Sequence, residues 1–191
     1  MKTILRGETK VIIAGARLSY ANIFEPKAFE GQDPKYSVSL IISKDDTETL
    51  DIIDKAIKNA MEQGKSKWGG KVPKNIKLPL HDGDIEREDD ESYQNSYYIN
   101  ASSKNAPGVV GLERDRATGK AIPLGSDEVY SGCYANVSVN FYAYDKGSNG
   151  ISAGLNNIQK CKDGERLGGG AAAAEDDFDF EDVDAADDFL F

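Results

Sequence analysis

The chain has 191 residues, which is enough for one domain with a sizeable core. Two cysteines and a single histidine exclude a disulfide framework and argue against histidine-based metal or triad chemistry. No apolar run approaches the roughly 20 residues that span a bilayer, and the first ten residues lack a signal-peptide core, so we expect a cytoplasmic protein.

Negative charge is concentrated in two segments. The chain carries 33 acidic and 23 basic residues, a net charge of -10. Residues 175–191 hold nine of the acids, and residues 82–91 hold seven acids with one Arg. Elsewhere basic residues outnumber acidic ones by 22 to 17. The low overall pI therefore does not exclude an anionic partner such as nucleic acid.

Apolar–polar alternation predicts several strands and one helix, taken here in chain order. Residues 10–18 are a weaker strand candidate, and residues 36–42 are a clear one. Asp45 and Glu48 resemble a capping box that opens a helix, which Gly64 would end. Further along the chain, weaker strands are predicted at 97–102 and 109–112.

The last two predicted strands form a hairpin. In residues 133–145 one face is apolar and the other polar, and residues 146–150 (KGSNG) are typical of a turn. Residues 151–158 form the returning strand, in which Gly154 is the expected bulge. The predicted inward face of the first strand comprises Cys133, Ala135, Val137, Val139, Phe141 and Ala143.

These elements indicate a mainly β fold: an OB-fold-like antiparallel barrel with one mid-chain helix, long loops and a disordered acidic C-terminal tail. Periodicity alone leaves a β-sandwich open as the alternative. We expect a folded domain over residues 1–167, a Gly/Ala tether over 168–174, and a partner-binding tail over 175–191.

Three clusters are candidates for a nucleic-acid interface. The loop 64–77 has five lysines, the only Trp and no acid, a combination suited to phosphates and base stacking. The polar face of 133–145 offers tyrosines between amides and hydroxyls. A third, weaker cluster lies between 114 and 120. The candidate residues are Lys65, Lys67, Trp68, Lys71, Lys74, Lys77, Arg114, Arg116, Lys120, Tyr134, Tyr142 and Tyr144.

Each cluster also has a purely structural interpretation. The lysines can be a solvated loop with Trp68 tucked into the core, and tyrosines are good strand formers on a half-exposed face. The acidic run 82–91 could hold Mg²⁺, but it matches no calcium-loop pattern, and a solvated acidic loop is the favoured interpretation. Phosphate-loop and dinucleotide motifs are missing from the sequence, so we expect no catalytic site, metal or cofactor.

The tail contains two copies of the pattern DDFxF, at 176–180 and 187–191. Its carboxylates resemble a polyphosphate and can compete for the body's cations in cis. In trans, Asp187, Asp188, Phe189, Leu190 and Phe191 can dock in an apolar pocket with a basic rim. A solubilising tail is the alternative, although the Phe residues would work against that role.

The body resembles a family of phage OB-fold single-stranded-DNA-binding proteins, long catalogued as a domain of unknown function. The resemblance covers about residues 8–170, and the tail is similar to the acidic, aromatic-ended tails of bacterial and phage single-strand binders. Bacterial tails typically end in Ile-Pro-Phe, whereas this chain ends in Phe-Leu-Phe. The matching blocks are 17–26 (RLSYANIFEP), 34–40 (PKYSVSL) with the helix after it, 98–102 (YINAS), 132–144 (GCYANVSVNFYAY) and 150–160.

The resemblance implies an OB fold that holds an oligonucleotide in a groove, and a tail that recruits replication and repair enzymes. We therefore expect sequence-tolerant binding of single-stranded DNA in phage replication, recombination or repair, in the host-cell cytoplasm. A protein-interaction adaptor and a Mg²⁺-dependent nucleic-acid enzyme are the alternatives. The sequence leaves open the oligomeric state, the site size and the preference between DNA and RNA.

Overall fold

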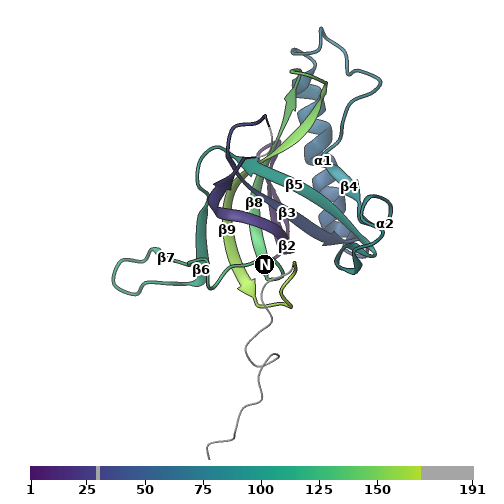
Figure 1. Cartoon of the computed structure of the whole chain (residues 1–191). Helices are drawn as coiled ribbons and strands as arrows, with labels where there is room; N and C mark the ends of the chain where they lie inside the picture. The colour runs from purple at the N-terminus through teal and green to yellow at the C-terminus, as the bar shows by residue number, and fades with distance from the viewer. Residues whose placement is uncertain (29–30, 169–191) are drawn as a thin grey trace, which may run out of the picture.

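A computed structural model describes residues 1–28 and 31–168 (Figure 1). The tether and the tail, including the predicted partner-binding residues 187–191, lie outside the described residues. In chain order the elements are β1 (Ile4–Arg6), β2 (Lys10–Lys27), β3 (Lys35–Ser43), α1 (Thr47–Gly64), β4 (Leu80–Asp82), α2 (Gly83–Glu86), a 3-10 turn η1 (Glu91–Tyr93), β5 (Ser96–Ser103), β6 (Gly108–Arg114), β7 (Ala121–Pro123), β8 (Tyr134–Tyr144) and β9 (Gly150–Lys162).

Five strands close a barrel. β2 pairs with β3, β3 with β5, β9 with β8 and β8 with β2, all antiparallel, and a parallel pairing of β5 with β9 completes the ring. The mainly β barrel class is confirmed, but the barrel is mixed rather than purely antiparallel. An odd number of strands requires this, because directions cannot alternate all the way around a ring of five.

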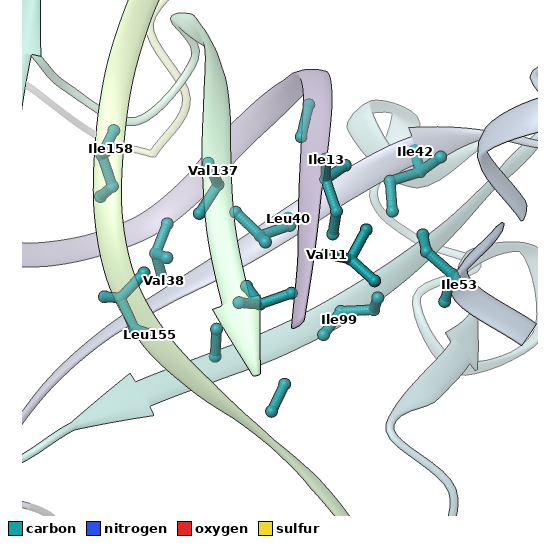
Figure 2. Close-up of a cluster of buried hydrophobic side chains, with 14 of the residues drawn as sticks. Val11, Ile13, Val38, Leu40, Ile42, Ile53, Ile99, Val137, Leu155 and Ile158 are labelled. Atoms are coloured by element: carbon teal, nitrogen blue, oxygen red, sulfur yellow. The ribbon is translucent and has the colours of Figure 1, made fainter. Parts of the chain in front are cut away.

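The core lies inside the barrel, where alternate residues of each strand meet (Figure 2). Six residues were predicted to face inward, Cys133 and five residues of β8, and all six are buried. In Figure 2, Val38 and Leu40 of β3 and Ile99 of β5 join Val137 in this core. Because Val38 and Leu40 of β3 and Ile99 and Ala101 of β5 point into this core, the residues between them, such as Ser39 and Asn100, face the outer side of the barrel.

Helix α1 is inserted between β3 and β5 and covers one end of the barrel (Figure 1). Its N-cap is Asp46, whose side chain accepts from the Thr49 backbone N–H at 3.1 Å, so the predicted cap at Asp45 was wrong by one residue. Asp45 instead accepts from the Asn95 side chain. The helix ends at Gly64 as predicted. A side chain is excluded at this position, because a Cβ would lie 2.5 Å from that of Ala143.

The hairpin of β8 and β9 forms as expected, but its bulge is displaced. Gly154 pairs regularly with Asn140, so the bulge predicted there was wrong. Ser138 pairs with Asn157 and Val139 with Leu155, which leaves Asn156 as the extra residue. The shift returns both Leu155 and Ile158 to the barrel interior, which a strict two-residue period would not allow.

Candidate nucleic-acid interface

A groove of about 480 Å³ crosses the outer face of β2, β3 and β5. Its floor consists of small polar side chains, because Ser37 and Ser39 alternate with the core residue Val38 along β3. Asn100 and Ser102 continue this floor on β5. The cationic side chains along the groove are Lys27, Lys35 and Arg87.

Tyr20 stands at the mouth of this groove with 57% of its surface exposed. It lies where the register between β2 and β3 shifts, and its φ is 46°, a left-handed conformation that is rare for an aromatic residue. The Asn22 side chain donates to the Tyr20 carbonyl at 3.2 Å, which helps hold this backbone. Strained backbone concentrates at functional sites, so the exposed ring marks this position as a candidate binding residue.

Arg87 faces Tyr20 across the groove mouth. Its guanidinium carbon lies 5.3 Å from the centroid of the Tyr20 ring, 5.7 Å from that of Tyr93 and 5.8 Å from that of Tyr98. The adjacent Tyr98 hydroxyl raises the pKa of Arg87 above its usual value. The guanidinium is therefore a fixed positive charge held on aromatic rings.

The acidic run positions Arg87. The Lys44 ammonium bridges Asp82 and Asp84 at 2.7 Å each, and its hydrogen bond lowers the pKa of Asp84. Asp82 also caps α2 by accepting from the Asp84 backbone N–H. The run is thus partly organised by caps and ion pairs, and it places its one cation against the groove.

The floor of the groove leads across the barrel seam to a second exposed ring. Ser102 of β5 is paired with Gly154 of β9. A Cβ on Gly154 would lie 3.5 Å from the ring of Tyr142, which is 45% exposed. Tyr20 on β2 and Tyr142 on β8 therefore stand at the two ends of a surface path over small residues that crosses β3, β5 and β9.

The predicted lysine-rich loop lies against the tip of the β8–β9 hairpin. Lys67 donates to the Ala143 carbonyl at 3.0 Å, and the Trp68 indole N–H donates to the Tyr144 carbonyl at 3.1 Å. Lys77 forms a backbone bridge with Gly150. Trp68 is half-buried against the core, and its stacking on a base stays a prediction.

The other lysines of this loop are more peripheral. Lys65 pairs with Glu62 at 2.6 Å, whereas Lys71 and Lys74 are exposed. The loop thus brings Lys67, Trp68 and Lys77 close to Tyr144 and the hairpin turn. Tyr142, at the far end of the groove path, lies on the same hairpin.

Tyr134 does not join these residues. It occupies the opposite end of β8, about 33 Å from Tyr144 at a strand rise of about 3.3 Å per residue. Its ring lies under the Lys162 ammonium at 4.5 Å and Arg17 at 5.8 Å. Asn136, between the two tyrosines, is buried, so the polar face of β8 is not one continuous exposed platform.

Arg114, Arg116 and Lys120 lie on the β6–β7 hairpin, which projects from the barrel (Figure 1). Sequence reasoning missed Tyr20, Lys35 and Arg87. Arg87 had one usable signal, since it is the only cation among seven acids. The sequence around Tyr20 contains no such signal, because the exposure and the φ of Tyr20 depend on the register shift.

The described chain ends beside the groove. Leu167 packs against Ile41, Tyr93 and Tyr98, the cluster on which Arg87 rests. The Leu167 N–H donates to the Ser131 carbonyl, and the Ser131 hydroxyl accepts from the N–H of Ala21, the residue after Tyr20. Leu167 therefore lies close to Tyr20 and Arg87.

Within residues 1–28 and 31–168 the structure offers neither a metal site nor a membrane-spanning helix. No three His, Cys, Asp or Glu side chains in these ranges are grouped so that they could hold a metal ion. No helix in the described part of the chain is long and apolar enough to cross a membrane.

The strand order defines an OB-like barrel, a fold class in which many members bind oligonucleotides. Residues 9–190 match the family model described as "Enterobacter phage Enc34, ssDNA-binding protein". The chain belongs to this family of phage single-stranded-DNA-binding proteins, which confirms the resemblance found in the sequence. The family consists of binding proteins rather than enzymes.

Individual relatives agree. The chain is 34% identical over 182 residues to putative protein p50 of Acyrthosiphon pisum secondary endosymbiont phage 1, covering 89% of this chain and 92% of that one. The structure is similar to the single-stranded DNA-binding protein from bacteriophage Enc34 in complex with ssDNA, with a TM-score of 0.75, 26% identity, and coverage of 87% and 93%. Bacteriophage T7 gp2.5 shares the fold alone, with a TM-score of 0.52, 14% identity, and coverage of 97% and 100%.

Proposed function

We propose that this protein binds single-stranded DNA along the groove over β2, β3 and β5 and acts in phage DNA replication, recombination or repair. The observation that carries the proposal is the pair formed by Tyr20 and Arg87 at the groove mouth: an exposed ring beside a cation that is held in place. Single-strand binding needs this combination, since cations neutralise phosphates and rings stack on bases.

Phosphate neutralisation and base stacking are assigned to different residues along the groove. Arg87 and Lys35 contact phosphates, with Lys27 on the same wall. One base stacks on Tyr20, and a second stacks on Tyr142 after the strand has passed over Gly154. The floor between the rings offers short hydroxyl and amide groups, which suits binding that tolerates any sequence.

The predicted residues outside the groove extend this interface. Lys65, Lys67, Lys71, Lys74 and Lys77 follow Tyr142 and Tyr144 at the hairpin tip and neutralise further phosphates. Trp68 anchors their loop, and its ring is offered to a base if the loop opens. Arg114, Arg116 and Lys120 on the projecting hairpin, and Tyr134 beside Arg17 at the other end of β8, are peripheral contacts for a longer strand.

The tail acts on the same groove and on other proteins. Its nine carboxylates compete with DNA for Arg87 and the lysines in cis. The position of Leu167 supports this role, because a segment tethered beside the site has a high effective concentration there. When DNA displaces the tail, Asp187, Asp188, Phe189, Leu190 and Phe191 become available to replication or recombination enzymes.

Titration with fluorescent oligo(dT) and a matched duplex tests the proposal. We expect preference for the single strand, and a loss of affinity in Arg87→Gln but not in Lys58→Gln, a control on the exposed surface of α1 paired with Asp54. An adaptor would show no binding to either DNA, and a Mg²⁺-dependent enzyme would degrade the substrate. Unchanged affinity in Arg87→Gln would refute the assignment of the groove.

A further inference from the structure

The β6–β7 hairpin presents apolar surface to solvent. Leu112 on β6 is 61% exposed, and Ile122 on β7 is 38% exposed. The root of β6 is bound to the barrel through the pairing of residues 108–110 with β9 and a hydrogen bond from the Gln159 side chain to the Gly111 carbonyl. In the described chain, β7 pairs with β6 alone, so its outer edge is open. An exposed edge strand with apolar side chains favours association with another protein surface.

The same hairpin is positively charged near its tip. Arg114, Arg116 and Lys120 are exposed and form no ion pair among the described residues. Two acids lie among them, the exposed Glu113 and Asp115, whose carboxylate accepts from the Thr118 backbone and hydroxyl at 2.7 Å each. Three cations against two acids leave the hairpin with a net charge of +1. A partner for this surface should therefore combine an apolar side chain with negative charge.

The surface around α2 has those properties. Ile85 is 74% exposed, and it is followed in sequence by the exposed acids Glu86, Glu88 and Asp89. Asp84, just before it, is paired with Lys44. The one cation of this segment, Arg87, is turned onto the tyrosine rings of the groove, so it does not neutralise these acids. An apolar residue within an acidic surface complements the cationic hairpin.

We propose that the β6–β7 hairpin of one molecule docks on the α2 surface of a second copy. The two surfaces lie on opposite sides of the barrel (Figure 1), so the contact joins unlike patches. A contact of this kind does not close on itself in pairs and adds copies in one direction. Because α2 leads directly into Arg87 at the groove mouth, each junction forms beside bound DNA, and copies line up along one strand.

The proposal is tested with full-length protein and three variants. The hairpin variant is Leu112→Ser with Ile122→Ser, the α2 variant is Ile85→Ser, and the control is Leu78→Ser, an exposed apolar residue that belongs to neither the β6–β7 hairpin nor α2. Each is titrated with oligo(dT) of about 10 nucleotides, which holds one molecule, and of about 70, which holds several. Sedimentation velocity is measured with and without DNA.

We expect the unaltered protein and the control to bind the long oligonucleotide at least about tenfold more tightly per site than the short one, because neighbours bury apolar surface. Both test variants should lose this enhancement while keeping their affinity for the short oligonucleotide. At high protein concentration, self-association without DNA should depend on the same residues, which separates this proposal from the DNA-binding function itself.

Mixing the two variants gives a sharper test. The hairpin variant keeps a working α2 surface and the α2 variant keeps a working hairpin, so an equimolar mixture should form pairs that cannot extend. Hairpin-to-hairpin pairing would leave Ile85→Ser fully cooperative, and a role of Leu112 and Ile122 in binding DNA would lower the affinity of the hairpin variant for the short oligonucleotide. Either result, or no enhancement in the unaltered protein, would overturn the proposal.

Discussion

Replacing Tyr20 with glycine separates what this residue does for binding from what it does for folding. The ring would no longer stack on a base, a contact that contributes about 1–3 kcal/mol. The expected loss of affinity for a short oligo(dT) is therefore about 5- to 150-fold.

The same substitution should leave stability nearly unchanged. Glycine adopts the φ of 46° without the steric cost of about 1–2 kcal/mol that a side chain incurs in the left-handed region. Against this gain stand the lost contact with Arg87, about 0.5–1 kcal/mol at an exposed site, and the greater freedom of glycine in the unfolded chain, about 0.5–1 kcal/mol. The two sides cancel to within about 1 kcal/mol.

Two measurements on purified protein check this reasoning: the Kd from fluorescence titration and the free energy of unfolding from urea denaturation. Tyr20→Phe, which keeps the ring, should bind as the unaltered protein does. Asn95→Gly is the matched backbone control, because Asn95 is the other non-glycine residue with positive φ (48°) among residues 1–28 and 31–168. The account is wrong if Tyr20→Gly binds normally, or if its weaker binding is explained by a large loss of stability.

The other predictions concern charge, the loop, the tail and pH. Arg87→Gln should reduce the slope of log K against log salt by about 0.7 if it removes one phosphate contact, measured by titration at several salt concentrations; an unchanged slope would contradict that contact. Trp68→Ala should lower the free energy of unfolding by about 2–4 kcal/mol, since a half-buried ring and its hydrogen bond to a backbone carbonyl are lost; normal stability with weaker binding would instead support stacking on a base. Deleting residues 175–191 should tighten binding to oligo(dT) at low salt, because a competing polyanion is removed; equal or weaker binding would reject competition in cis. Asp84 has a lowered pKa in the folded state, so its contribution to stability is present above the ordinary pKa of an Asp and is lost as the pH falls through the lowered value. Asp84→Asn should therefore lose less stability than the unaltered protein between about pH 5 and pH 2, as followed by urea midpoints.

Local patterns predicted the barrel well where one face of a strand is buried. The alternation in β8 identified every inward residue, because burial of a single face imposes a period of two. The same reasoning failed at Asn156, since a bulge changes the period without any change in composition. The N-cap moved from Asp45 to Asp46, two adjacent residues with the same capping ability.

The groove was harder to predict, because it joins residues that are distant in sequence. Arg87 lies 67 positions after Tyr20, and its role depends on Lys44 and Tyr98, which hold the acidic run in place. Charge counting assigned this run to solvent and so discarded its one cation. The lysine-rich loop 64–77 was visible as a cluster because its cations are close together in the chain, which is the kind of site that composition can detect.

The parallel pairing between β5 and β9 has a consequence for how the protein becomes active during synthesis. β9 is the last strand, yet it pairs with β5, β6 and β8, and the floor of the groove is continuous only once Gly154 is beside Ser102. Such distant pairings form late and slow the folding reaction. A nascent chain whose residues 150–162 are still inside the ribosome therefore has no finished groove. Premature termination before this strand should yield a polypeptide that neither closes the barrel nor retains DNA.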